Sequence, residues 1–181
     1  MTLLGWSEHD LGVPGRVLPV VPASHPVLSA ASERVDAADP KVTQIAADLV
    51  ATMRVSPGCV GLAAPQIGIG WHVFSVDVGG HAKARTTHGT FALCNAEVIE
   101  ATRWEKAREG CMSVPDLTGD VKRATRLVVA GELAGSAEHV VVETDAFEAR
   151  ALQHEIDHCE GLLFLDRVAG AHAVFRRRVY R

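Results

Sequence analysis

The sequence predicts an α+β domain, in which short, mostly antiparallel strands surround a central helix that carries two histidines. Two segments with helical apolar spacing, at 40–54 and 146–160, lie on either side of several short apolar runs typical of strands. The 181 residues suffice for one domain with a sizeable core, and no linker or repeat divides the chain. We therefore expect a single domain over 1–181, with an irregular N-terminal arm over 1–25.

The arm and the first helix differ in composition. The arm shows little periodicity, and prolines recur through it and just beyond: Pro14, Pro19, Pro22 and Pro26. The first helix is predicted over 40–54, where apolar residues recur at helical spacing. Asp39 can cap this helix with Pro40 in its first turn, and the sequence SPG at 56–58 ends it.

Short strands are predicted between the two helices. Apolar and β-branched runs favour strands at 72–78, 90–99, 127–130 and 140–143. A polar loop over 79–89 joins the first two, and a turn-rich segment over 109–115 precedes the others. Small residues fill 58–68, which lets the backbone approach another group closely. Near the C-terminus, 172–181 is expected to form one or two further helical turns.

The second helix carries the most informative pattern. No proline or glycine interrupts 146–160, Asp145 and Glu148 fit a capping box, and Gly161 can end the helix. His154 and His158 are four residues apart, so a helix places both imidazoles on one face. The apolar flanks of the histidines indicate that this face points into the protein and not into solvent.

Two neutral imidazoles at this spacing can share one metal ion, and Glu155 is well sited as a general base. A catalytic tetrahedral ion needs a third protein ligand and one open position. Cys111 is the best candidate, because the remaining histidines lie in segments without motif support. A Cys–His–His set suits Fe²⁺, Zn²⁺, Co²⁺ or Ni²⁺, which leaves the metal open. The sequence thus predicts a metal-binding helix.

Composition argues against several function classes. The net charge of −4 does not provide the basic surface typical of nucleic-acid-binding proteins, so no direct DNA binding is expected. The arginines at 176–178 are a local exception that fits either a solvated helix end or a dock for an acidic partner. No segment approaches the roughly 18 apolar residues that span a bilayer, and the four cysteines form no C-x-x-C pair. We therefore expect a cytoplasmic protein without membrane association.

Three stretches together resemble the signature motifs of peptide deformylases: GLAAPQ at 61–66, EGCMS at 109–113 and QHEIDH at 153–158. They occur in the order of that family and with roughly its spacing, and the resemblance covers about residues 25 to 168. It implies a metallohydrolase that removes the N-formyl group from the N-terminal formyl-methionine of nascent polypeptides and releases formate. The implied partner is an N-formylated peptide, a transient ribosome contact is left open, and a monomer is expected.

The resemblance also implies roles for single residues. The metal ligands would be Cys111, His154 and His158. The native ion would be Fe²⁺, with Zn²⁺, Ni²⁺ or Co²⁺ as replacements. The catalytic groups would be the general base Glu155 and two oxyanion donors, the Gln66 amide and the backbone N–H of Met112. The peptide substrate would be bound by Val60, Gly61 and Gly110.

The chain departs from the family pattern at Cys59, where the family usually has glycine. A side chain there could narrow the substrate cleft or add an oxidisable thiol, which leaves a specialised deformylase with another N-formyl substrate open. A zincin-type peptidase is disfavoured, because it leaves the motifs around Cys111 and Gln66 unexplained. A non-catalytic metal-binding or peptide-binding relative is a further alternative.

Overall fold

The structure, a computed structural model, describes residues 1–5 and 9–178. Its strands form one seven-stranded sheet in the order β1-β6-β5-β4-β3-β2, and β7 pairs with β5. The strands are β1 (Thr2–Leu3), β2 (Gly61–Ala63), β3 (Val73–Val76), β4 (Phe91–Cys111), β5 (Val114–Leu133), β6 (His139–Asp145) and β7 (Val174–Arg176). Every pair is antiparallel except β1 with β6, which is parallel.

The mixed α/β content confirms the predicted class, but the expectation of short strands was wrong for the centre of the sheet. β4 and β5 are 21 and 20 residues long, and only Met112 and Ser113 separate them. The segment over 109–115, predicted to be rich in turns, therefore contains the tight turn of a long hairpin. Register shifts between Cys94 and Glu97, and again near Gly110, interrupt the ladder, which is where long strands can bend.

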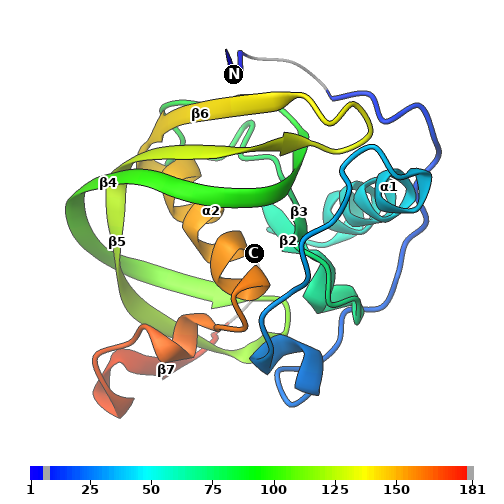
Figure 1. The fold of residues 1–181 in the computed structure, drawn as a ribbon. Coiled ribbons are helices and arrows are strands. Elements are labelled where there is room, and N and C mark those ends of the chain that lie inside the picture. Colours follow the sequence, from blue (N-terminus) through cyan, green and yellow to red (C-terminus); the bar gives the residue numbers. More distant parts are fainter. Residues whose placement is uncertain (6–8, 179–181) are drawn as a thin grey trace.

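The two α-helices lie on different sides of β2 and β3, which both helices contact (Figure 1). Helix α2 (Ala146–Cys159) contacts β2, β3, β5 and β6, and α1 (Pro40–Val55) contacts β2 and β3. A core that includes Phe74, Leu152 and Ile156 lies between α2 and the sheet. Among the described residues, no helix is long and apolar enough to cross a membrane.

The first helix begins and ends as its sequence predicts. Asp39 accepts a hydrogen bond from the backbone N–H of Lys41 at 2.8 Å, and Pro40 occupies the first helical position. The helix continues through Val55, one residue beyond the predicted end. It buries one apolar face in a second core, with Leu49 and Met53 almost fully inaccessible.

The predicted capping box at the start of α2 was wrong. Asp145 accepts from the Thr86 hydroxyl at 2.9 Å and makes no side-chain cap bond. Glu148 is fully buried and accepts from the His88 backbone N–H at 2.9 Å and from the Thr144 hydroxyl at 2.6 Å. Tertiary partners have therefore replaced the local ones.

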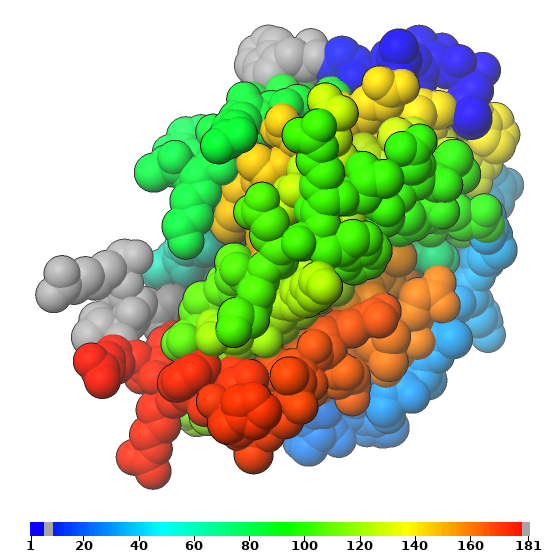
Figure 2. Space-filling view, turned by 90° about the vertical axis from the view of Figure 1, so that its left-hand side faces the viewer, coloured from blue at the N-terminus to red at the C-terminus, as the bar shows by residue number. Residues whose placement is uncertain are grey.

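The end of α2 agrees with its prediction, but the segment near the C-terminus does not. Gly161 ends the helix at φ +77°, and a Cβ there would lie 2.7 Å from the Ala30 carbonyl carbon. In place of further helix over 172–181, a 3-10 turn (Ala171–Ala173) leads into β7, and 179–181 lie outside the described residues. Figure 2 shows this C-terminal segment (red) lying along the β4–β5 hairpin (green), with which β7 pairs.

In the described residues 1–5 and 9–25, the N-terminal arm forms only the short strand β1, and it is anchored to α1. Arg16 donates to the Asp48 carboxylate from its backbone N–H at 2.8 Å and from its guanidinium at 2.6 Å. Gln44 donates to the same carboxylate at 2.9 Å. Burial alone would raise the pKa of Asp48, but these hydrogen bonds outweigh it and lower the pKa below its usual 3.8.

Replacing Asp48 with asparagine should therefore loosen the arm. We expect the free energy of unfolding at pH 7 to fall by about 1–3 kcal/mol, typical of lost hydrogen bonds to a charged group. Because the pKa of Asp48 is lower in the folded state, its contribution is present above the unfolded value of 3.8 and is lost as the pH falls through the folded value. Urea unfolding of both proteins from pH 7 to pH 3 would show the difference shrinking. A difference that stays constant with pH would contradict the ionic role.

Candidate active site

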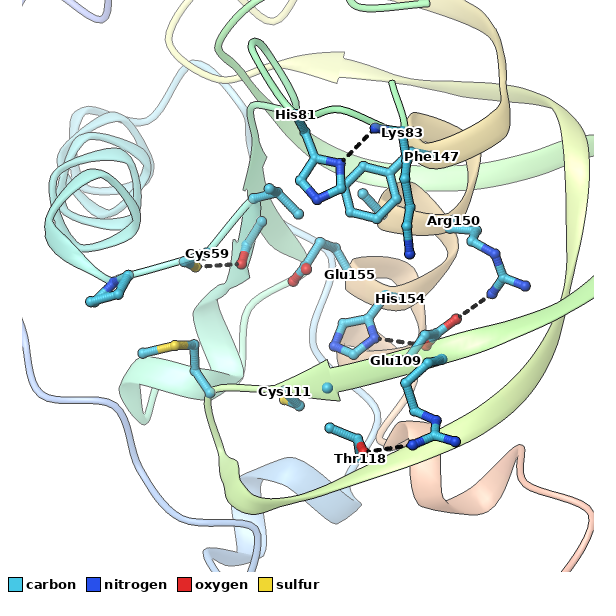
Figure 3. Close-up of a pocket in the computed structure, with 18 of the residues that line it drawn as sticks. Cys59, His81, Lys83, Glu109, Cys111, Thr118, Phe147, Arg150, His154 and Glu155 are labelled. Atoms are coloured by element: carbon cyan, nitrogen blue, oxygen red, sulfur yellow. Dashed lines mark hydrogen bonds and ion pairs between the residues drawn. The ribbon is translucent and has the colours of Figure 1, made fainter. Parts of the chain in front are cut away.

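One cleft, of about 470 Å³, brings together all three motif stretches (Figure 3). Its walls come from β2, from the turn between β4 and β5, and from the face of α2 that carries His154 and Glu155. The loop between β3 and β4 adds His81 and Lys83. Segments that lie up to about a hundred residues apart along the chain therefore meet at one place.

The three predicted metal ligands lie together at the base of this cleft. Their ligand atoms, on Cys111, His154 and His158, all lie within 4.8 Å of one another. The Cys111 Sγ is 3.3 Å from the His158 Nε2, which is 3.2 Å from the His154 Nε2. Cys111 and His158 are buried and His154 is half-buried. Their positions fit one shared ion, although the role of each residue stays a prediction.

A carboxylate behind His154 sets the orientation of its ring. Glu109 lies 3.1 Å from the His154 Nδ1, which directs the Nε2 toward Cys111. Such a carboxylate–histidine pair is the usual outer support of a metal-binding imidazole. Burial would raise the pKa of Glu109, but its bonds to His154 and Arg123 outweigh this effect and lower the pKa to about 2.

The two imidazoles have opposite electrostatic environments. Burial lowers the pKa of His158 well below its usual range, and the neighbouring His154 adds to the effect. Burial acts the same way on His154, but hydrogen bonds with Cys111 and Glu109 raise its pKa well above that range. A metal ion would compete with the proton at the His154 Nε2, because ligand binding requires that nitrogen to be deprotonated.

Two buried arginines hold Glu109 in place. Arg123 donates to it from Nε at 2.9 Å and also pairs with Asp157 on α2. Arg150 donates to Glu109 at 2.9 Å and to the Glu105 carbonyl at 2.7 Å. Asp157 is buried and therefore belongs to this network. No sequence pattern pointed to Arg150, which resembles a solvated residue of an amphipathic helix.

Gln66 points its amide at the metal-ligand cluster. Its Oε1 accepts from the Ala63 backbone N–H at 3.0 Å, so its Nε2 must face the other way. That Nε2 lies 3.4 Å from both the Cys111 Sγ and the Ser113 Oγ. Ser113, the last residue of the second motif stretch, was not singled out by the sequence. A buried, oriented amide donor is therefore available beside the predicted ligands.

Glu155 lies next to His154 in the cleft (Figure 3) and is 3% exposed. Burial raises its pKa to about 7, and its Oε2 has no hydrogen-bond partner among the described residues. A Cβ at Gly61 would lie only 2.5 Å from the Glu155 Oε1. Only glycine at that position leaves room for the carboxylate, which explains why β2 begins with it.

The other predicted residues also line the cleft, with different backbone roles. The Val60 carbonyl accepts from the Asp77 N–H at 2.9 Å, inside the sheet. Backbone groups of successive residues in a strand point to opposite sides, so the N–H and C=O of Gly61 point to the free edge of β2. A Cβ on Gly110 would collide with the Arg177 guanidinium, which donates to the Cys111 carbonyl at 3.4 Å. Met112 is half-buried at the hairpin turn.

Cys59 lines the cleft beside these backbone groups. Its thiol donates to the Gly61 carbonyl at 3.1 Å. Burial raises the pKa of the thiol to about 12, and the charge of Glu155 acts in the same direction. The thiol is therefore protonated at neutral pH and acts as a hydrogen-bond donor.

Comparison with known proteins gives a consistent result. The sequence model of the polypeptide deformylase family matches residues 17–173. This chain belongs to the peptide deformylase family. A peptide deformylase of Carboxydothermus hydrogenoformans is 38% identical over 151 residues, which cover 83% of this chain and 93% of the relative.

Solved deformylase structures share the fold. The peptide deformylase of Thermotoga maritima superposes with a TM-score of 0.76 at 31% identity, over 86% of this chain and 99% of that one. A class I type b peptide deformylase from Acinetobacter baumannii, solved with Met-Ala-Ser bound, gives a TM-score of 0.76 at 31% identity over 84% and 99% of the two chains. The family is metal-dependent, in agreement with the Cys–His–His cluster of this chain.

Proposed function

We propose that this chain hydrolyses the N-formyl group of peptides that begin with formyl-methionine, releasing formate and a free α-amino group. One observation carries the proposal: the Gln66 amide and the Glu155 carboxylate flank the cluster of Cys111, His154 and His158 in a single cleft. A zincin-type peptidase would need neither the buried cysteine nor the oriented amide.

The donor set fits a divalent transition metal. Two imidazole nitrogens and one thiol converge within 4.8 Å, and Glu109 supports one imidazole from behind. Cys111, His154 and His158 would hold the ion, and Fe²⁺ is our assignment for the native one, with Zn²⁺, Ni²⁺ or Co²⁺ as replacements. Such an ion supplies Lewis acidity and makes a water molecule acidic enough to attack near neutral pH.

The protein's own residues would handle the proton and the developing charge. Glu155 would accept the proton of the attacking water and pass it to the departing amine, for which a buried carboxylate with a pKa near 7 is well suited. A nearby dication would lower that pKa somewhat. Attack on the formyl carbon places negative charge on the formyl oxygen. The Gln66 amide and the Met112 N–H would donate to this oxygen, and losing one such donor typically costs about 10²–10³ in rate.

The free edge of β2 offers a place for the peptide. β2 is the last strand of the sheet, and Gly61 directs its N–H and C=O to the open side. An extended peptide could pair there as an added strand, with Gly110 and the Val60 side chain lining its path. The Met-Ala-Ser bound to the Acinetobacter relative supports a peptide in this cleft. Such a substrate would place the reaction in the cytoplasm; a monomeric state and a ribosome contact stay predictions.

The direct test is formate release by protein purified without oxygen and loaded with Fe²⁺. We expect hydrolysis of formyl-Met-Ala-Ser, loss of activity on chelation, and recovery when Fe²⁺ or Ni²⁺ is returned. Acetyl-Met-Ala-Ser serves as the control for a formyl-specific reaction. Failure to release formate from any formyl peptide, with metal shown to be bound, would refute the proposal.

Cys59 is expected to weaken substrate binding, because its thiol occupies the Gly61 carbonyl that a peptide N–H would use. Replacing Cys59 with alanine should lower the KM for formyl-Met-Ala-Ser about two- to fivefold, in line with a weak S–H···O bond of 0.5–1 kcal/mol. The matched control is Cys59→Ser, which keeps a donor at this site and should not lower the KM. Equal KM values for the two variants would argue that the thiol bond plays no part.

A further inference from the structure

The loop between β3 and β4 contributes a cation to the cleft that the proposed mechanism does not use. Lys83 lies on this loop and lines the cleft together with His81. Figure 3 shows the Lys83 side chain extending past Phe147 toward the interior of the cleft, on the side of Arg150 and Glu155. The ammonium is thus directed at space that a peptide would occupy, although the residue itself is exposed.

Contacts on either side of Lys83 hold the loop backbone in place. The His81 ring stacks on Phe147 of α2, with ring centroids 3.8 Å apart and planes at 8°. The Lys83 backbone N–H donates to the His81 Nδ1 at 3.2 Å. Further along, His88 is held by the fully buried Glu148 through its backbone N–H at 2.9 Å and its Nδ1 at 2.7 Å. Contacts on both sides of Lys83 therefore attach this part of the loop to α2.

The cleft as a whole is cationic. Its lining holds four basic side chains against two carboxylates: Lys83, Arg108, Arg150 and Arg177 against Glu109 and Glu155. Glu109 is engaged by Arg123 and Arg150, while Arg108 pairs with Asp120 at 2.7 Å.

Lys83 differs from these side chains. Among residues 1–5 and 9–178, no carboxylate lies within ion-pair distance of its ammonium. A lysine that projects into a substrate cleft without an acidic partner is available for an anionic group of the ligand.

We propose that Lys83 is a specificity-determining residue that favours formyl peptides with a carboxylate in the first residues after the methionine. This inference rests on the proposed function, since it takes the occupant of the cleft to be a formyl peptide. The formyl end would lie at the cluster of Cys111, His154 and His158, and Lys83 is not part of this cluster. Its ammonium would therefore meet a later part of the peptide. The carboxylate can belong to an aspartate or glutamate side chain or to the C-terminus of a short peptide.

The test compares matched peptides on the metal-loaded protein. We expect kcat/KM for formyl-Met-Ala-Asp-amide or formyl-Met-Asp-Ala-amide to exceed that of the corresponding asparagine peptide about threefold, through KM, as for a partly solvated ion pair. Lys83→Ala should bring the ratio to one, and Lys83→Glu should invert it in favour of a lysine-containing peptide. Comparing formyl-Met-Ala-Ala as free acid and as amide separates a C-terminal carboxylate from a side chain.

Two controls make the result decisive. Lys41→Ala removes an exposed lysine of α1 that does not line the cleft, and it should leave the aspartate-to-asparagine ratio unchanged. Binding of the products Met-Ala-Asp-amide and Met-Ala-Asn-amide, measured by calorimetry, reports the same preference without turnover. Formate release with no acidic preference, or a preference that survives Lys83→Glu, would overturn the role of Lys83 and leave the proposed function standing. Absence of formate release with the binding preference intact would refute the proposed function and leave the role of Lys83 standing.

Discussion

Replacing Glu155 with glutamine is expected to lower kcat/KM for a formyl peptide by about 10²–10⁴, the usual contribution of a positioned general acid–base. Glutamine has nearly the same shape, so it should still fit against Gly61, where the carboxylate leaves no room for a Cβ. It cannot accept the proton of the attacking water. The loss should therefore appear in kcat more than in KM.

Metal content and stability distinguish this effect from damage to the site. Glu155 is not among the clustered ligand atoms, so the bound metal, measured by mass spectrometry, should be unchanged in Glu155→Gln. The variant should unfold at the same temperature or a higher one, because a buried carboxylate without a partner at Oε2 is costly to keep charged. Formate release at the wild-type rate would show that the proton is transferred by another group.

Local patterns predicted the parts of the site that local structure controls. The spacing of His154 and His158 needs only a helix to place both rings on one face, and α2 provides it. The cap at Asp39 and the stop after Arg54 likewise depend on neighbouring residues, which is why α1 was predicted to within one residue. Family resemblance linked Gln66 and Cys111 to this helix, since no local pattern could bring residues 66, 111 and 154 together.

The long strands were not predicted because their sequence lacks the usual alternation of apolar and polar residues. Residues 97–108 in β4 are mostly exposed, and the segment is rich in charged residues such as Glu105 and Lys106. These residues form a strand because β5 pairs with them along nearly their whole length, as with Glu105 opposite Arg123. Such pairing is a tertiary property. Strand propensity read from one segment cannot report it.

The same limit explains the failed capping box and the unpredicted residues of the cleft. Glu148 can satisfy a helix terminus locally, yet it binds His88, which is 60 residues away. The bond between Glu148 and His88 attaches the loop that carries Lys83 to α2. A short stretch of sequence does not contain both residues, so it cannot reveal the bond. Arg150 was missed for a similar reason, because its burial depends on Glu109 on a strand 41 residues earlier.

Replacing Arg123 with alanine should be the most destabilising single change at the site. Arg123 is 3% exposed and pairs with both Glu109 and Asp157, so its removal leaves two carboxylates in a buried environment with fewer partners. Breaking a buried ion pair from one side typically costs about 3–5 kcal/mol. We expect a loss of that size in urea unfolding at pH 7, partly offset by Arg150 and by Arg167, which donates to Asp157 at 2.7 Å.

The effect on metal binding connects this charge network to function. Glu109 orients the His154 ring, and Arg123 holds Glu109, so a looser carboxylate should weaken metal affinity about 10–100-fold, as for other outer-shell changes. Competition with a chelator of known affinity would measure it. Arg126→Ala, on the same strand but outside the cleft, is the matched control. If Arg123→Ala lost stability but kept wild-type metal affinity, Glu109 would be held by Arg150 alone, and Arg123 would act only in folding.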